Sequence, residues 1–392
     1  MRQTLTSFRD VMMKHNDFCL PDGMSAETFL ADYWQKKPLL IKGGLPALVG
    51  MFEPEDVLGL ALEDGVSARL ISQDDANPDQ WSLKQSPLSE EDINQAPTLW
   101  TILVQNLEQW SPELGELWSH FDFIPKWQQD DIMVSVAPEG GSVGAHYDEY
   151  DVFLAQGFGA RRWILGKMCD ADTPFVPDQP IRLLDDMGQI IFDEVLEAGD
   201  VLYVPPGLSH HGIAQNDCLT FSFGFRRPNL VQIIDEIADV ATNHSELFRV
   251  LTLPQGRQND AFELSDDSIQ AMKKAVLDLL NSKAGDALFA DAIAELVSKR
   301  QYELLAFEDE LSADELGDRL SDGEAVMLNP ACRFVRKGTA WYVNGECVSF
   351  DAEALALFER LIAGEVIGDG DVDDEKLQTL SQWLNDNWLV MV

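Results

Sequence analysis

Three residues of the sequence have the types and the spacing of metal ligands. His146 and Asp148 lie two apart in AHYDEYDVFL, whose alternation and β-rich composition predict a strand, so both side chains are expected on one face. A second histidine follows a Pro-Pro-Gly turn in VLYVPPGLSHHG, which offers His210 and His211. Two histidines and one carboxylate on one face of a metal leave its other positions open, the arrangement that holds non-haem Fe(II).

A cation is expected beside this group. The chain runs out to Gln156, turns through Gly157-Phe158-Gly159 and returns as ARRWIL, which predicts Arg161 on the neighbouring strand. Arginine pairs a planar carboxylate through two parallel charge-assisted hydrogen bonds. Arg161 therefore suits the far end of a dicarboxylate co-substrate.

The order of elements predicts an α+β chain. Its 392 residues exceed one ordinary core, and we expect three parts, 1–227, 228–302 and 303–392. The first part begins with a helical cover, including helices over 99–110 and 117–127, and from Asp131 its short strands and regular turns indicate a jelly roll. Three amphipathic stretches then predict helices, and the last part mixes short strands with helices.

The composition argues against several classes of function. Lys and Arg number 28 against 68 Asp and Glu, a net charge of −40, so we expect no direct binding to nucleic acid and favour a basic protein partner. No stretch approaches the roughly 20 apolar residues of a membrane span, and we expect a soluble cytoplasmic protein. A disulfide framework or a zinc ribbon is not expected because the cysteines are scattered singly, at Cys19, Cys169, Cys218, Cys332 and Cys347.

One acidic run imitates a calcium loop. The segment 369–375, DGDVDDE, has the opening spacing of an EF-hand, but Asp374 stands where the loop needs Gly and Leu380 where it needs Glu. We interpret the segment as an acidic turn in solvent.

The chain resembles the JmjC-type 2-oxoglutarate oxygenases. The HxD, a basic residue fifteen positions after its histidine, and the PPGxxH occur in the order of that family. More narrowly, FLADYWQKKPLLIKGG and GAHYDEYDVFLAQGFGARRW follow the pattern of the bacterial ribosomal oxygenases. The departures are Ala145 in place of Pro before the first ligand and His211 in place of Glu after the last.

The resemblance assigns roles to the residues above. It implies that His146, Asp148 and His210 bind Fe(II), that Arg161 binds the C5 carboxylate of 2-oxoglutarate, and that O2 is the second co-substrate. It further implies a double-stranded β-helix (cupin-like JmjC) domain, a helical region that forms a homodimer, and a C-terminal winged helix. The role of His211, beside the ligand or on the surface, stays open.

Alternation along the strand after His210 extends the predicted site. In 218–225, CLTFSFGF, the small residues share one face and the large apolar residues share the other. We expect the small polar face to line the barrel, which makes Thr220 and Ser222 candidate contacts to 2-oxoglutarate.

The substrate pocket is predicted from three residues. Asp131 and Met133 share one face of an extended run, and Tyr150 follows Asp148 by the same alternation. A carboxylate, a thioether and an aromatic ring suit a long cationic side chain, although Met133 fits core packing equally well.

The resemblance also names a substrate. It implies hydroxylation, at the β-carbon, of an arginine in protein sixteen of the large ribosomal subunit, with a ribosomal histidine as the rival. Two further alternatives are an inactive JmjC-like module that binds basic proteins, and a zinc- or manganese-dependent cupin enzyme, which makes no use of Arg161.

Overall fold

The structure, a computed structural model, describes residues 18–253, 262–300 and 310–392. These residues form two compact units, each with its own hydrophobic core. The first unit runs to Arg226 and includes Glu310 and Asn329–Ala331, and the second contains the remainder from Arg227 onward. The predicted boundary at 302 lies outside the described residues, and the division into three parts stays a prediction.

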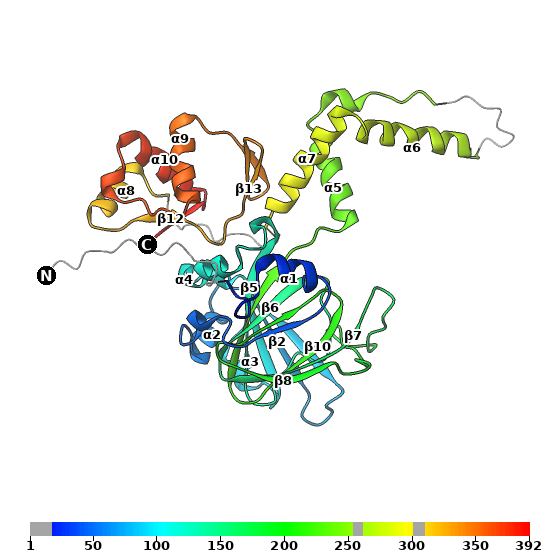
Figure 1. Cartoon of the computed structure of the whole chain (residues 1–392), viewed down its shortest axis with the longest axis vertical. Helices are drawn as coiled ribbons and strands as arrows, with labels where there is room; N and C mark the ends of the chain where they lie inside the picture. The colour runs from blue at the N-terminus through cyan, green and yellow to red at the C-terminus, as the bar shows by residue number, and fades with distance from the viewer. Residues whose placement is uncertain (1–17, 254–261, 301–309) are drawn as a thin grey trace. The chain divides into compact units, whose positions relative to one another are not determined.

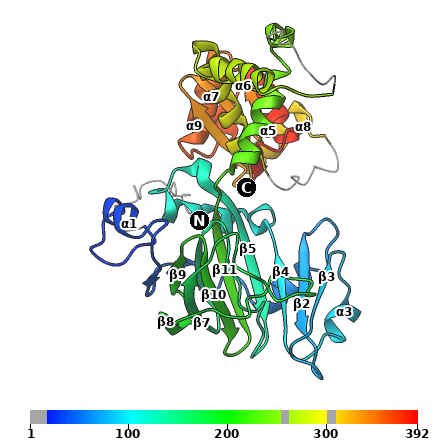
Figure 2. The same cartoon turned by 90° about the vertical axis from the view of Figure 1, so that its right-hand side faces the viewer.

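The first unit is the predicted cupin-like jelly roll. An eight-stranded sheet has the order β1-β9-β6-β11-β5-β4-β2-β3, and a three-stranded sheet has the order β10-β7-β8. Figure 2 shows the strands of the larger sheet side by side, with β2 and β3 at one end. The strands are β1 (Leu39–Ile41), β2 (Ala68–Gln73), β3 (Trp81–Gln85), β4 (Trp100–Val104), β5 (Gln129–Ala137), β6 (Asp151–Phe158), β7 (Ala160–Met168), β8 (Phe192–Glu197), β9 (Val201–Val204), β10 (Leu208–Ala214) and β11 (Cys218–Phe225).

Apolar side chains from both sheets meet in one buried cluster. Leu154 of β6 and Leu202 of β9 belong to it from the larger sheet, and Leu165 of β7 and Leu208 of β10 belong to it from the smaller. The two sheets therefore pack face to face, as in a sandwich.

The other face of the larger sheet is covered by aromatic packing. Phe121 lies 4.9 Å from Phe153 of β6 and 4.8 Å from Phe223 of β11, between ring centroids, and all three side chains are buried. Figure 1 shows the short helices of this cover around the sheet. They are α1 (Ala26–Asp32), α2 (Pro54–Leu60), α3 (Glu90–Asn94) and α4 (Pro112–Glu116), with 3₁₀ turns at Pro46–Leu48, Leu107–Gln109, Leu117–Phe121 and Lys126–Gln128.

Two of the predicted helices in this cover are wrong. Most of 99–110 is strand β4 and a 3₁₀ turn, because Ile102 and Val104 alternate into the core and the strand pairs with β2 and β5. The segment 117–127 forms only short 3₁₀ turns. Trp118 and Phe121, three residues apart, both reach the core, which is the spacing that a 3₁₀ turn brings to one side.

The second unit begins with the three predicted helices, α5 (Leu230–Ala241), α6 (Asp266–Leu280) and α7 (Lys283–Ser298). Val240 of α5 packs with Leu288 and Ala292 of α7. Lys299 donates to both carboxylate oxygens of the buried Glu236, at 2.7 and 2.6 Å. These contacts fix α5 against α7.

The winged helix predicted for the C-terminal part is confirmed. Its core gathers around the buried ring of Phe358 on α9, which contacts Trp341, Phe350 and Trp383. Tyr342 donates to Asp291 of α7 at 2.7 Å, so α7 is joined to this fold. The elements are α8 (Ala313–Ser321), β12 (Val326–Leu328), β13 (Phe334–Lys337), β14 (Ala340–Val343), β15 (Glu346–Val348), α9 (Ala352–Ile362), α10 (Asp374–Asn385) and β16 (Leu389–Met391).

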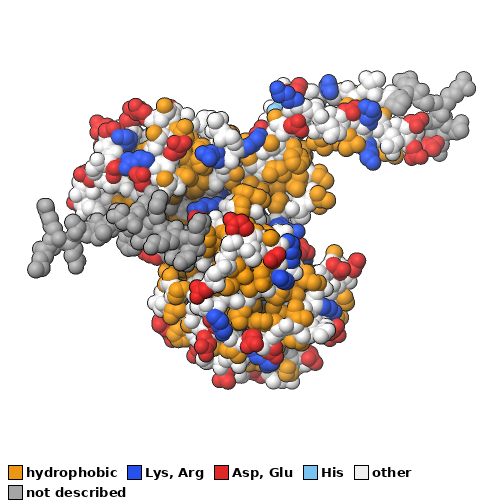
Figure 3. Space-filling model, in the orientation of Figure 1, with side chains coloured by type: hydrophobic (Ala, Val, Ile, Leu, Met, Phe, Trp, Pro, Cys, Tyr) orange, Lys and Arg blue, Asp and Glu red, His pale blue; other side chains and the backbone are white. Residues whose placement is uncertain are grey.

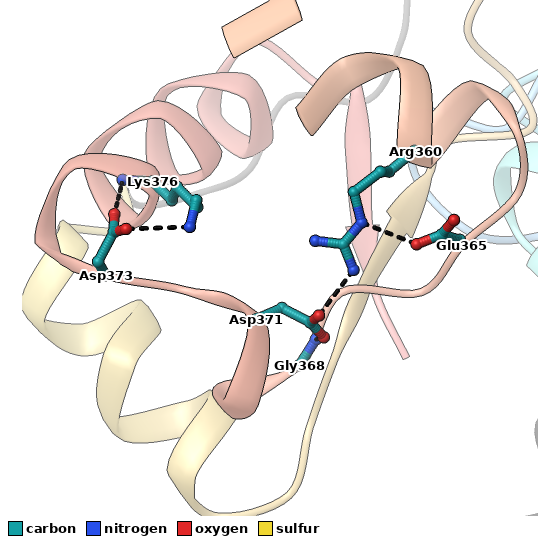
Figure 4. A network of polar contacts seen from close by, with 6 residues as sticks. All are labelled: Arg360, Glu365, Gly368, Asp371, Asp373 and Lys376. Carbon is teal, nitrogen blue, oxygen red and sulfur yellow. Dashed lines mark hydrogen bonds and ion pairs between the residues drawn. The ribbon is translucent and has the colours of Figure 1, made fainter. Parts of the chain in front are cut away.

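The acidic run that imitates a calcium loop is tied to cations of the protein. Arg360 donates to Asp371 at 2.6 Å and to Glu365 at 2.8 Å, and Asp373 pairs with Lys376 at 2.9 Å (Figure 4). These carboxylates cap and cross-link the ends of α9 and α10.

Two expectations from composition concern the whole chain. All five cysteines are free thiols, as their scattered positions predict. Within the described ranges, every helix is too short or too polar to cross a membrane.

Candidate metal centre

His146, Asp148 and His210 come together, and one ligand atom from each lies within 4.8 Å of the other two. The two imidazole centroids are 4.2 Å apart, and Nε2 of His210 lies 3.5 Å from a carboxylate oxygen of Asp148. No second cluster of three such ligand atoms occurs in the parts of the chain that the structure describes.

The strand predicted over His146 and Asp148 is wrong. Strand β6 begins only at Asp151, and the two ligands lie in the loop before it. The loop is fixed because its backbone bonds to two other segments, one around the start of β10 and one at Leu184. His146 exchanges two hydrogen bonds with His210, of 3.0 and 2.8 Å; the carbonyl of Asp148 accepts from Gly207 and that of Ala145 from Leu184. A strand would instead form a ladder with one continuous partner strand, which these residues do not have.

Both imidazoles are oriented through Nδ1. Nδ1 of His146 lies 3.0 Å from the carbonyl oxygen of Gly144. Nδ1 of His210 lies 2.9 Å from the carbonyl oxygen of Leu208. A ring that donates from Nδ1 to a carbonyl keeps a lone pair on Nε2, the usual metal-binding form. Burial, together with the neighbouring His146, lowers the pKa of His210 to about 4, so its imidazole is neutral at neutral pH.

The donor set fits a divalent transition metal. Two imidazoles and one carboxylate are the ligand types of the facial triad in non-haem Fe(II) sites.

Arg161 is a buried cation on β7. Its side chain is 2% exposed, and a terminal nitrogen lies 3.6 Å from the thiol of Cys218. Within the described residues no carboxylate pairs with it and its Nε has no partner. A buried charge is costly unless it is paired, so this guanidinium is suited to an anion that enters from outside.

The predicted route to Arg161 is wrong in one respect. β6 and β7 are not paired, because the chain passes from the larger sheet to the smaller one at Gly159. That glycine has φ of +62°, and a Cβ there would lie 2.2 Å from the carbonyl oxygen of Asp217. Arg161 instead shares a sheet with His210, since β7 pairs with β10.

Thr220 and Ser222 lie on the inner face of β11, opposite its buried phenylalanines. The hydroxyl of Thr220 donates to Gln156 Oε1 at 2.8 Å, because the amide nitrogen of Gln156 itself donates to the carbonyl of Phe158. The proton of Thr220 is thereby engaged, and only its lone pairs remain. A contact from either hydroxyl to a co-substrate stays a prediction.

The three predicted substrate residues do not all have the same surroundings. Tyr150 is 38% exposed, and the charge of Asp148, together with burial and the charge of Asp131, raises its pKa well above the usual value. Tyr150 and Asp131 therefore share the electrostatic surroundings of the metal ligand. Met133 instead contacts Arg69, whose Nη2 lies 3.8 Å from its sulfur.

Sequence reasoning missed three residues near this site. Arg69 puts a cation beside the proposed substrate residues, and Gln156 anchors Thr220. Trp163 lies 5.9 Å from the His210 ring, between centroids, and Arg161 Cζ lies 5.9 Å from the Trp163 centroid. The two-residue spacing from Arg161 was the available signal for Trp163, and a lone amide in the apolar run VFLAQGF was the signal for Gln156.

His211 is half-buried, and burial together with the charge of His146 lowers its pKa to about 4. It is not one of the three clustered ligands.

Comparisons with known proteins extend over both units. Residues 116–233 match the JmjC domain family and residues 275–390 match the ROXA-like winged helix family. The chain is 46% identical to the probable ribosomal oxygenase of Haemophilus influenzae, over 96% of this chain and 98% of that one. It is 32% identical to the ribosomal protein uL16 3-hydroxylase of Escherichia coli, over 92% and 96%. The solved structure of YcfD, a ribosomal oxygenase from E. coli, in complex with cobalt and 2-oxoglutarate superposes with a TM-score of 0.76 at 28% identity, covering 94% and 98%.

Replacing His146, Asp148 or His210 singly with Ala is expected to weaken Mn(II) binding more than about a hundredfold, since removing even a residue that only supports a ligand costs 10–100-fold. Calorimetric titration measures the affinity, and the melting temperature confirms an intact fold. His211→Ala is the matched control and should retain Mn(II) affinity. Unchanged affinity in any of the three variants would remove that residue from the site.

Proposed function

Because this chain belongs to the ribosomal oxygenases with a JmjC domain and a ROXA-like winged helix, we propose that it is a protein hydroxylase dependent on Fe(II) and 2-oxoglutarate. The observation that carries the proposal is that the jelly roll contains both the metal-ligand cluster and Arg161. The guanidinium of Arg161 is buried and lacks a carboxylate partner among the described residues. A zinc- or manganese-dependent cupin enzyme would leave that cation unexplained.

Each part of the site has a role in this reaction. Bound iron would supply O2 activation coupled to the decarboxylation of 2-oxoglutarate to succinate, with one oxygen atom inserted into a substrate C–H bond. His146, Asp148 and His210 would hold this metal. Arg161 binds the C5 carboxylate and so fixes the direction from which the co-substrate approaches the metal.

We further propose that the substrate is an arginine side chain of a large-subunit ribosomal protein, hydroxylated at its β-carbon. The charges of Asp148 and Asp131 both act on Tyr150, and this acidic surrounding suits a cationic side chain; the net charge of −40 favours a basic protein. A relative bears the name uL16 3-hydroxylase, which agrees with this choice. Arg69, beside Met133, adds a positive charge that would repel a cationic side chain. A neutral histidine imidazole therefore remains the rival substrate.

A homodimer through the helical region is the remaining proposal about partners. Leu230, Val231 and Ile234 of α5 are 76%, 76% and 66% exposed, whereas another face of the same helix packs on α7. Val276 and Leu277 of α6 are also about half exposed. Figure 3 shows hydrophobic side chains gathered over these helices. A second copy would cover such faces, and the ribosomal substrate supports a cytoplasmic location.

Arg161→Ala should raise the 2-oxoglutarate requirement roughly ten- to a hundredfold, because a charge-assisted contact is lost. Succinate release measured against 2-oxoglutarate concentration tests this. Arg162→Ala is the matched control, since Arg162 is exposed and pairs with Asp193 on the outer surface. An unchanged requirement in Arg161→Ala would show that the assignment is wrong.

The substrate is tested with whole ribosomal proteins. Incubation with iron and 2-oxoglutarate should add one oxygen atom to an arginine, located by tandem mass spectrometry. Asp131→Asn should lose most of this modification, whereas Asp130→Asn, an equal change of charge at a residue paired with Arg226, should lose less. Modification only at histidine would exclude the arginine substrate; succinate formation without any modified protein would leave only the co-substrate half of the proposal standing.

The dimer is tested by mass measurement in solution. At micromolar concentration the protein should have twice the chain mass, and Ile234→Glu should give monomers, because a charge cannot be buried unpaired in an apolar interface. Val366→Glu, at another exposed apolar residue, is the control and should stay dimeric. A monomeric wild-type protein would contradict the proposal.

A further inference from the structure

The inner face of β7 carries two buried nitrogen donors without acceptors. Nε of Arg161 and Nε1 of Trp163 have no hydrogen-bond partner within the described residues, and the two side chains are 2% and 4% exposed. Residues two apart on a strand project to the same face, so both donors border the same space between the sheets.

Trp163 is equally far from a metal ligand and from Arg161. Its ring centroid is 5.9 Å from that of His210 and 5.9 Å from the guanidinium carbon of Arg161. A ligand that reaches from the metal ligands to Arg161 would therefore pass close to this ring. Gly212 of the paired strand β10 leaves room for the ring, because a Cβ there would come within 2.7 Å of the indole. The ring thus packs directly on the backbone of β10.

Packing alone does not account for an indole at this position. A phenyl ring would fill apolar surroundings without burying an unpaired N–H, which is unfavourable because a buried polar group that loses water needs another partner. Buried tryptophans usually find an acceptor for this atom. The structure offers none among the described residues, so the acceptor is expected to arrive with a ligand.

Two of the hydroxyls on the facing strands are already engaged. Thr220 donates to Gln156, and the hydroxyl of Ser135 lies 3.3 Å from the carbonyl oxygen of Thr220. A carboxylate that enters beside Arg161 therefore meets Trp163 as a neutral N–H donor that is not yet used.

We propose that the indole N–H of Trp163 donates a hydrogen bond to the distal carboxylate of 2-oxoglutarate, together with the guanidinium of Arg161. This inference rests on the proposed function and adds to it a residue that binds the co-substrate. The ionic contact supplies attraction, and the indole, which packs on Gly212, supplies a direction for the second oxygen.

Trp163→Phe removes the N–H and keeps an aromatic ring. Calorimetric titration of the Mn(II)-loaded protein measures affinity for 2-oxoglutarate and for 2-oxobutyrate, which shares the 2-oxo acid group and lacks the distal carboxylate. We expect roughly tenfold weaker binding of 2-oxoglutarate, with unchanged affinity for 2-oxobutyrate and for Mn(II). Trp118→Phe, at a buried tryptophan in the core on the other face of the larger sheet, is the matched control and should bind as the wild type does.

Each other result is decisive. Unchanged 2-oxoglutarate affinity in Trp163→Phe overturns the inference, and so does an equal loss for both acids, because that loss would lie in packing near the metal. Wild-type protein that binds Mn(II) and no 2-oxoglutarate overturns the proposed function itself.

A measurement on the wild type covers the case in which the variant does not fold. The sequence has ten tryptophans, and in Zn(II)-loaded protein a single indole N–H signal should move downfield in the nitrogen–proton spectrum on addition of 2-oxoglutarate, but not of 2-oxobutyrate. Indole signals that respond alike to both acids, or to neither while 2-oxoglutarate binds, contradict the inference.

Discussion

Two backbone hydrogen bonds between His146 and His210 hold the proposed site together. They are an isolated bridge and do not belong to a ladder, and they join a loop to strand β10 of the smaller sheet. The same loop is also bonded to Gly207, just before β10, and to Leu184, so its backbone is fixed at three residues. Ligands on a loop held this firmly can keep one geometry although the segment has no regular secondary structure.

One face of β11 packs in the hydrophobic core, and the other face carries polar residues of the proposed site. Phe221, Phe223 and Phe225 enter the aromatic core, and this packing fixes the strand without using its inner face. The inner face is thus free to carry Thr220 and Ser222, and the network through Gln156 settles where the Thr220 proton points. On β11, the aromatic side chains therefore face the core and the polar side chains face the space between the sheets.

Different charges of the protein act on a basic protein partner and on a small dicarboxylate. The chain has a net charge of −40, yet Arg161 is buried on the strand that pairs with the strand of His210, and Arg69 lies beside Met133. Long-range attraction of a basic partner depends on the summed charge, whereas binding of a small dicarboxylate depends on one desolvated cation. An acidic surface and a buried anion-binding arginine can occur in one protein, because water and salt screen surface charges far more than buried ones.

The sequence by itself determined the jelly roll, the three helices and the residue types of the site, because period-2 and period-3.6 patterns and short motifs are local properties. The winged helix followed from the resemblance of the chain to a known family. The sequence failed over 99–110, where apolar and aromatic residues suit helix and strand alike until β2 and β5 provide partners. Only the tertiary structure decided that β6 and β7 lie in opposite sheets, that His146 and Asp148 precede the strand, and that Trp163 lies near both Arg161 and His210. Those outcomes depend on hydrogen bonds and packing between segments far apart in the chain, which no local pattern encodes.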